Sequence, residues 1–476
     1  MNASVQLWSP KLTLFAFQLR HDLASSSQKT IEDADNLWQK CEAISQDLGL
    51  IELTDILPKL QLQTNDNQNL TSSYYRQLLP QKAIYFNQVP QAKKLCLTGE
   101  FYPVQLHDTY AVDLTFRYAN LTVDLAQISG LNPQQKLHPN FIKASLGQTL
   151  LFFAELRCKY DDLRSIADDC MQQLNLGELH YINDFIFLGS PVFEYNNSSQ
   201  TCHLLIWLNC YSETTEKEEA GNYYDPLLKL LCYHHKILYV YEQSRYCDRE
   251  ARKLYSQLEG KVTALSNQFP NSETQLEIFK EWLKTASQVA FTYETHLRDL
   301  EVHQTTININ AKNYAWRLTE LESCSLLGDN LTAFQQFLEI TKEQRQEQIA
   351  VDLAYLNPGK ELFRQMLETI RGLVEIDQAQ RDRAQSELDK ERDRDLQILL
   401  TAIGAGLGMA GVTATAYPYY KEAKPEEHQL TPPFTSSQLH PITESILVSL
   451  GLGLLTFVLF CLPLVYFWLK KRSRSE

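Results

Sequence analysis

The C-terminal end of the chain constrains its fold more than any other segment. Residues 445–469 are 25 consecutive uncharged residues rich in Leu, Val and Phe, and a basic tail at 470–476 follows them. About 20 apolar residues suffice for a helix to cross the hydrocarbon layer of a bilayer. Clustered Lys and Arg favour the cytoplasmic side. The pattern therefore predicts a transmembrane helix over 445–469 with the tail in the cytoplasm.

A second uncharged stretch covers residues 396–420, where Gly, Ala and Thr replace much of the Leu and Phe of a lipid-facing helix. It is long enough to span, and we predict a first transmembrane helix there; the alternative is a buried helix or a re-entrant segment. With two spans, residues 421–444 form an outer loop. The prediction is a multi-pass protein of the cell membrane, in contact with the lipid bilayer, with both termini in the cytoplasm.

The composition of the remaining chain is that of globular proteins. Its 476 residues suggest two or three structural units. The net charge of −14 and the lack of a basic block in the main body argue against a nucleic acid polymer as partner, because phosphate contacts need clustered Lys and Arg. The ten cysteines contain no C-x-x-C pair, so we interpret them as reduced thiols in a cytoplasmic body.

Residues 1–222 are predicted to form an N-terminal α/β or α+β cytoplasmic domain. Helices are predicted over 26–48 and 147–173, and the polar stretches 196–201 and 212–222 are predicted as exposed loops. The segments with the β-branched and aromatic character of strands are 12–19, 111–118, 184–188 and 203–209.

Beyond this domain the pattern changes to long antiparallel helices. Asp225 followed by Pro226 is an N-cap with a first-turn proline, and it predicts a helix that ends before Pro270. A capping box at Ser272 begins the next helix. The later helices are predicted over 272–323, over 330–357 and from Lys360 onward.

Residues 223–358 form the predicted long-helix region. The last of these helices, over 359–395, is predicted as a charged stalk helix. The stalk has an apolar stripe and then carries mixed charge up to residue 395, where it meets the first uncharged stretch without a break. Such a stripe needs neighbours to bury it, and symmetric copies of the same helix supply them most economically. We therefore expect a homo-oligomer.

Small and polar residues follow one stripe of the first uncharged stretch. At about 100° per residue, these positions share one face. The stripe has two interpretations: close helix packing, or the lining of an ion pathway. The residues are Gln397, Thr401, Gly404, Gly408, Gly411 and Thr415.

The predicted outer mouth carries acidic residues near its aromatic edge. In a ring of subunits they would concentrate cations, whereas the alternative is an ordinary solvated loop. The residues are Tyr417, Glu422, Glu426 and Glu427.

Two groups of residues are candidate metal ligands. On the stalk, Asp377, Asp389 and Asp393 could bridge divalent cations such as magnesium between subunits, or could simply solubilise a helix surface. The second group shares one predicted helix, with His203 near it, and could hold zinc. One helical face cannot present all four residues, so we expect core packing instead. Its members are Cys232, His234, His235 and Cys247.

No sequence motif indicates an enzyme. The chain contains neither the G-x-S-x-G turn that presents a nucleophilic serine nor the H-E-x-x-H pair of zinc proteases. No cofactor is indicated apart from a divalent cation. We expect a protein that binds or transports without catalysing a reaction.

The complete layout resembles the CorA family of magnesium channels: a mixed N-terminal body, long helices, a stalk entering a first membrane helix, an outer loop, a second membrane helix and a basic tail. Where the family has Gly-Met-Asn at the outer end of the first membrane helix, this chain has Gly408, Met409 and Ala410 in mid-segment. The resemblance implies a homopentamer whose cytoplasmic domains gate a cation pathway. Because this asparagine is missing, the resemblance does not imply selectivity for magnesium.

Divergent proteins of this layout also resemble membrane effectors of prokaryotic antiviral defence, in which a cytoplasmic domain responds to a small nucleotide signal. Three hypotheses follow. The first is a cation channel or transporter gated by its cytoplasmic domain, and the second is a signal-gated effector. The third is a membrane-tethered scaffold without transport.

Overall fold

The computed structural model describes residues 5–22, 30–65, 75–90, 95–197, 199, 201–266 and 273–385, and seven positions between 447 and 462. The chain divides into two compact units. The first comprises residues 1–269 and 285–366, and the second 270–284 and 367–476. In the second unit, the described residues are the helical stretches 273–284 and 367–385 and the seven positions between 447 and 462.

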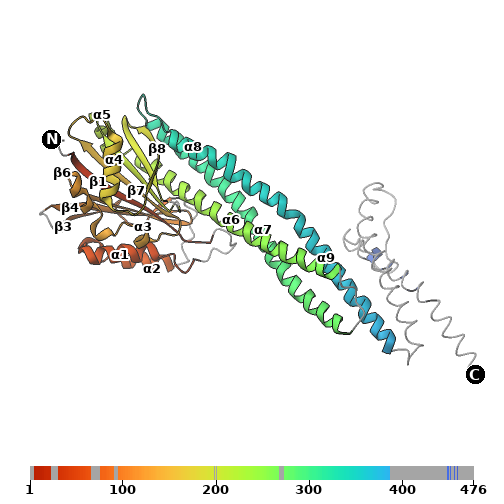
Figure 1. Ribbon diagram of the computed structural model, residues 1–476. Coiled ribbons are helices and arrows are strands. Elements are labelled where there is room, and N and C mark those ends of the chain that lie inside the picture. The colour runs from red at the N-terminus through yellow and green to blue at the C-terminus, as the bar shows by residue number, and fades with distance from the viewer. Residues whose placement is uncertain are drawn as a thin grey trace, which may run out of the picture. The chain divides into compact units, whose positions relative to one another are not determined.

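Within the described residues, ten strands of the first unit form a single sheet (Figure 1). Its order is β2-β4-β5-β1-β7-β10-β9-β8, with β3 also paired to β4 and β6 to β1. The pairs are antiparallel except β7 with β10, which is parallel. The strands are β1 (Gln6–Leu19), β2 (Tyr75–Gln77), β3 (Ile84–Pro90), β4 (Cys96–Leu106), β5 (Thr109–Arg117), β6 (Thr122–Asp124), β7 (Gly147–Leu156), β8 (His180–Phe187), β9 (Ser190–Asn196) and β10 (Cys202–Asn209).

The four central strands, β5, β1, β7 and β10, are buried on both faces. Successive side chains of a strand point to opposite faces, so a strand that is apolar at nearly every position needs cover on both sides. Leu204, Ile206 and Leu208 of β10 point to one face, while His203, Leu205 and Trp207 point to the other, and all six are buried.

Short helices cover the first face. They pack on an apolar core that takes alternate residues of every central strand, such as Leu14 of β1 and Phe152 of β7, and Trp38 of α1 is fully buried in it. The helices around this sheet are α1 (Asn36–Leu48), η1 (Ile51–Leu53), α2 (Leu57–Asn65), η2 (Leu125–Leu131), η3 (Pro133–Gln135), α3 (Pro139–Ile142) and α4 (Leu163–Leu174).

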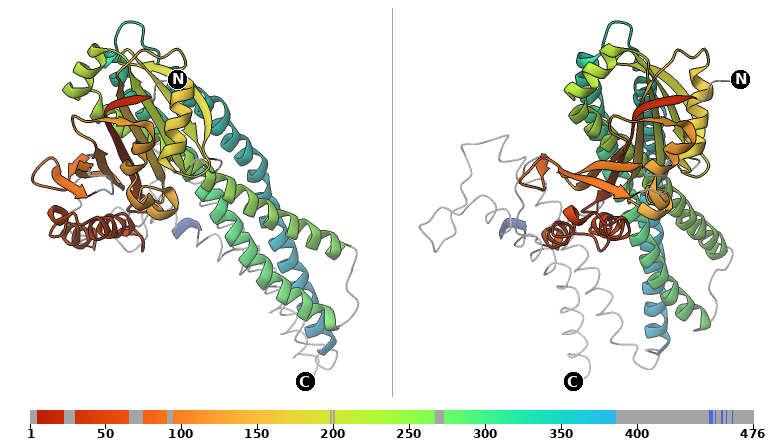
Figure 2. Two further views of the ribbon diagram at one scale, coloured as in Figure 1. Left: turned by 60° about the vertical axis from the view of Figure 1, so that its left-hand side comes forward. Right: turned by 90° about the vertical axis from the view of Figure 1, so that its left-hand side faces the viewer.

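A long helix, α6, begins on the second face, and its later turns run beside α7 and α9 away from the sheet (Figures 1 and 2). Leu228 and Leu231 of α6 are buried there, and Tyr224 packs on Phe15 of β1 with ring centroids 5.9 Å apart. The elements after the sheet are α5 (Ser212–Ala220), α6 (Tyr224–Ser266), α7 (Glu273–Cys324), α8 (Thr332–Ile340), the π-helical segment η4 (Thr341–Gln346) and α9 (Glu347–Gln385).

The loop between α7 and α8 is attached to the hairpin turn between β8 and β9. Leu188 and Gly189 of this turn both have positive φ, as two-residue hairpin turns require. Their backbone N–H groups donate to the carboxylate of Asp329 at 2.7 Å each. Asp329 also accepts from the N–H of Leu326 at 2.8 Å. The Asp329 carboxylate therefore attaches the loop between α7 and α8 to the β8–β9 edge of the sheet.

Most of the predicted helices and all four predicted strand segments are present, but three local predictions were wrong. Residues 147–156 form β7 rather than the start of a helix, because their unbroken apolar run is that of a strand covered on both faces. Residues 212–220 form α5 rather than a loop. The helix expected to end at 357 continues through Pro358 to residue 385.

Helix α9 passes Pro358 because packing outweighs the cost of the proline. Phe363, one turn further on, stacks on Tyr293 of α7 with ring centroids 4.5 Å apart. Gly359 is needed for this contact, since a Cβ there would clash with the Tyr293 hydroxyl and lie 3.0 Å from Cδ2 of Tyr255. The proline–glycine pair, which signals a helix end in the sequence, here permits the close approach of two helices.

The prediction of two membrane-spanning helices, and with it a multi-pass location in the cell membrane, is contradicted by the structure. Among the residues described, no helix combines the length and the apolar character needed to cross a bilayer. The long helices α6, α7 and α9 carry charged residues throughout, because each buries one face in the protein and exposes the other. The segments 396–420 and 445–469 lie outside the described residues, apart from the seven positions in the second.

Candidate functional site

A group of buried polar side chains lies where the first half of α6, residues 224–240, crosses the second face of the sheet. We call this surface the sheet–helix joint. On the first face the buried residues of the central strands are mostly apolar, with Gln18 of β1 and Gln148 of β7 as exceptions, whereas on this face β5, β7 and β10 contribute Asp113, Thr149 and His203, all buried. Three side chains of α6 meet polar partners here, so polar contacts define the register of the helix on the sheet.

The first contact of the joint surrounds Asp113 of β5. The hydroxyl of Tyr224 donates to its Oδ2, and Thr115 Oγ1 donates to its Oδ1 at 2.8 Å. Thr115 Oγ1 in turn lies 2.8 Å from Thr13 Oγ1 on β1. The first turn of α6 is thereby connected to two central strands through a carboxyl group.

Asp113 has an unusual affinity for protons. Burial raises the pKa of its carboxyl to about 7, and the negative charge of Glu100 on β4 adds to this effect, against the hydrogen bonds from Tyr224 and Thr115. A carboxyl with such a pKa is partly protonated near neutral pH. The first turn of α6 therefore contacts a carboxyl group whose charge changes with pH near neutrality.

The second contact is an ion pair between Lys236 of α6 and Asp108 in the turn between β4 and β5. The Lys236 side chain is 5% exposed, so its ammonium depends on this partner. Burial acts to lower the pKa of Lys236, but the Asp108 carboxylate outweighs it and the pKa is raised. Lys236 thus remains charged inside the joint.

The third contact is a chain of hydrogen bonds through His235, Thr149, His203 and Glu194, which we call the histidine relay. His235 Nε2 lies 2.9 Å from Thr149 Oγ1, and Thr149 Oγ1 lies 3.3 Å from His203 Nδ1. His203 Nε2 lies 2.9 Å from Glu194 Oε1 on β9. The relay joins α6 to three neighbouring strands.

His234, beside the relay, is fully enclosed. Its ring stacks on His203 with centroids 5.0 Å apart and on Phe337 of α8 with centroids 3.9 Å apart. Among the described residues neither of its ring nitrogens has a hydrogen-bond partner. Burial lowers its pKa well below the ordinary value, and the neighbouring histidines and Arg345 add to this. His234 is therefore neutral at physiological pH.

Arg345 brings the π-helical segment to the same place. Its guanidinium lies 4.9 Å from the centroid of the Phe337 ring and 5.9 Å from that of Tyr241 in α6, and its Nη1 donates to Thr341 Oγ1 at 3.0 Å. π-helical turns occur often at functional positions. Here the widened turn places a cation beside the histidines.

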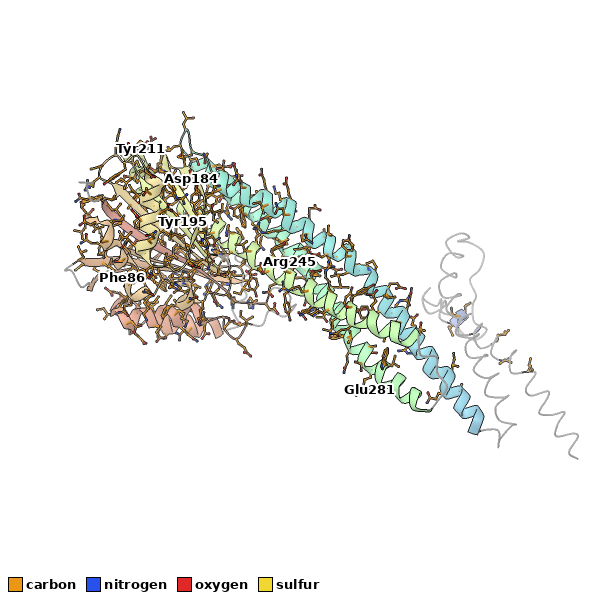
Figure 3. All side chains as sticks on the ribbon, in the orientation of Figure 1. Phe86, Asp184, Tyr195, Tyr211, Arg245 and Glu281 are labelled. Atoms are coloured by element: carbon orange, nitrogen blue, oxygen red, sulfur yellow. The ribbon has the colours of Figure 1, made fainter. Side chains whose placement is uncertain are left out.

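Further along α6, polar contacts join the helices of the first unit. Arg245, labelled among the long helices in Figure 3, pairs with Asp352 of α9, whose side chain is 2% exposed. Arg252 Nη2 reaches the same carboxylate at 3.3 Å. The hydroxyl of Tyr293 in α7 donates to the Leu356 carbonyl of α9 at 2.5 Å. One helix, α6, therefore touches both the sheet and the bundle.

Most of the site residues predicted from the sequence lie outside the described residues. Among the three stalk carboxylates, Asp377 falls within α9, where its side chain is not described, and Asp389 and Asp393 lie beyond it. The remaining residues outside are the proposed pathway lining Gln397, Thr401, Gly404, Gly408, Gly411 and Thr415, and the outer mouth Tyr417, Glu422, Glu426 and Glu427.

The cysteine and histidine group is packed in the core, as expected. All four of its side chains are buried, and Cys232 and Cys247 are free thiols. His203 does approach the helix, but through ring stacking and the relay rather than as a metal ligand. Within the described part of the chain, no three His, Cys, Asp or Glu side chains are arranged to hold a metal ion.

Sequence reasoning missed Asp113, Thr149 and Glu194. Each stands in a strand whose neighbours are mostly apolar, for example Thr149 before five consecutive apolar residues of β7. A polar residue inside such a run signals a buried polar contact, because both faces of the strand are covered. Its partner cannot be found from the strand alone.

Comparisons with known proteins yield no relative: no family model, no curated protein and no solved structure matches the chain.

Proposed function

We propose that this chain is a non-enzymatic regulatory protein in which the N-terminal sheet domain receives a small-molecule signal and α6 passes the change to the helices. The expected signal class is a small nucleotide, and the expected assembly is a homo-oligomer. Cation transport is not part of the proposal, since it depended on the two membrane-spanning helices.

The observation that carries the proposal is the polar construction of the sheet–helix joint. A joint needed for stability alone would be served by apolar packing, since buried ion pairs add little net stability over apolar groups of the same volume. Lys236 on Asp108 and Tyr224 on Asp113 instead define one register of α6 on the sheet. A helix held in one register by discrete contacts can transmit a shift as a unit.

An exposed apolar stripe on α9 supports the homo-oligomer. Val351, Tyr355 and Leu362 are 44%, 74% and 41% exposed, and their spacing places them on one side of the helix. No charged residue shares that side between them, whereas Lys360 and Arg364 lie on the opposite side. A second copy of the same stripe is the occupant that the proposal expects.

The oligomer is tested by measuring the mass of the native particle. The proposal expects several copies, and it expects Tyr355→Glu to reduce the copy number because a carboxylate would be buried at the contact. Lys360→Glu, on the opposite side of α9, is the matched control and should leave the mass unchanged. A monomeric wild-type particle would contradict the assembly.

Signal transmission is tested by hydrogen exchange of the full chain with a panel of mononucleotides, dinucleotides and cyclic oligonucleotides. A bound signal should change exchange in the sheet domain and also in α9 over residues 347–366. A change confined to the sheet domain would contradict transmission through α6. If no nucleotide binds, the proposed signal class is wrong.

A further inference from the structure

We infer that the histidine relay and His234 form a proton-sensing site, and that protonation of His234 and His235 releases α6 from β7 and β10. The inference deepens the proposed function, on which its consequence for the helices rests, by adding protons as a regulator of the same joint. It depends on the geometry of five side chains. They are His234 and His235 of α6, Thr149 of β7, His203 of β10 and Glu194 of β9.

With Glu194 as a carboxylate and His203 as a neutral imidazole, the relay has a defined direction. His203 then donates its Nε2–H to Glu194 Oε1, and its Nδ1 accepts from the Thr149 hydroxyl. Thr149 Oγ1 then accepts from Nε2–H of His235. His235 Nδ1 is left without a proton, and it has no hydrogen-bond partner among the described residues. The relay is complete when His235 is neutral.

A proton added to His235 has no acceptor in the joint. It would sit on Nδ1, which faces the backbone of Gly147 so closely that a Cβ there would come within 2.8 Å. A buried cation without a partner is costly, and the cost falls when the helix moves away and admits water. Protonation therefore favours the separated arrangement.

A proton added to His234 would likewise be a buried charge without a partner. The groups facing its ring are His203 on β10, His235 on its own helix, Phe337 on α8, Tyr314 on α7 and Arg345 on η4. The nearby carboxylate, Glu194, already accepts from His203. An added charge on His234 would thus meet a guanidinium and two histidines rather than an anion.

The size of the effect follows from proton linkage. Burial lowers the pKa of His235 to about 3 and lowers that of His234 well below its ordinary value of 6.5. A histidine freed by opening regains its ordinary pKa, so lowering the pH from 7.5 to 5.5 raises the open population about tenfold for each histidine freed. Two histidines give about 100-fold.

The test is hydrogen exchange of the full chain at pH 7.5 and 5.5, corrected for the intrinsic exchange rate. In the wild-type protein the protection of α6 residues 231–240 and of β10 should fall about 100-fold between these pH values. His234→Phe keeps the ring stacking and removes one titrating group, so the fall should shrink to about tenfold. His180→Asn, at an exposed position of β8, is the matched control and should behave as the wild type.

Either of two results overturns the inference: a wild-type joint whose protection does not change with pH, or a His234→Phe variant with the wild-type dependence. If His234→Phe does not fold, His234→Gln carries the same expectation, because its amide is neutral throughout. Exchange in α9 over residues 347–366 separates the two proposals. A pH response at the joint without one in α9 supports the proton-sensing site and contradicts transmission to the helices.

Discussion

Replacing Asp113 by asparagine should change how the stability of the sheet domain depends on pH. Asp113 is 3% exposed, and burial together with Glu100 raises the pKa of its carboxyl from 3.8 to about 7. In the unfolded chain the group ionises near its ordinary pKa. Between pH 4 and pH 7 the folded state therefore holds a proton that the unfolded state has lost, and the free energy of unfolding falls as the pH rises.

The magnitude follows from the shift. A change of about 3 pKa units corresponds to about 4 kcal/mol, which is the upper limit of the penalty that ionised Asp113 imposes above pH 7. Asparagine is neutral at every pH and keeps one acceptor for Tyr224 or Thr115. Weakening the other hydrogen bond costs about 1 kcal/mol. The variant should thus be more stable than the wild type at pH 8, by up to about 3 kcal/mol, and no more stable at pH 4.5.

The assay is urea unfolding at pH 4.5, 6 and 8, followed by tryptophan fluorescence, which reports on Trp38 and Trp207 in the two faces of the sheet. The difference between the variant and the wild type should grow with pH. Asp55→Asn, at an exposed position, is the control and should show no such trend. A variant less stable than the wild type at pH 8, or a difference independent of pH, would refute the reasoning.

Three further substitutions test the helical region and its attachment. Gly359→Ala should lower the free energy of unfolding by about 1–3 kcal/mol, because the new Cβ meets Tyr293, and urea titration measures this. Asp352→Asn should cost up to about 3 kcal/mol by leaving the Arg245 guanidinium without its carboxylate, while Arg252 keeps its pair with Asp248; Glu361→Gln, in an exposed pair, should leave the unfolding midpoint unchanged. Asp329→Ala removes the acceptor of three backbone N–H groups and should raise hydrogen exchange in the β8–β9 turn, with a cost of about 1–3 kcal/mol; unchanged exchange there would contradict its role.

Periodicity along the chain was enough to predict α6 and α7 to within a few residues. Both helices begin within one residue of a strong local signal, α6 at Tyr224 beside the Asp225–Pro226 pair and α7 at Glu273 beside Ser272, and both repeat apolar residues at helical spacing. The same reasoning failed at 147–156. An unbroken apolar run has no periodicity, so its conformation is decided by what covers it, and β7 is covered on both faces.

Local signals also failed where tertiary contacts opposed them. Pro358 and Gly359 are typical of a helix end, yet α9 continues because Phe363 beyond them stacks on Tyr293.

Long apolar stretches led to the prediction of membrane spans, while among the described helices none is long and apolar enough for that role.

Composition and spacing determined the broad organisation of this protein: an α+β domain followed by long helices, with histidines and cysteines packed in a core. The tertiary structure alone decided that Asp113, Thr149 and His203 share one face and meet Tyr224 and His235 of α6. The physical reason is the range of the contacts. Helix periodicity is set by neighbours within a turn or two, whereas the polar contacts of the joint link residues separated by up to 128 positions, whose proximity arises only when the sheet and helix have formed.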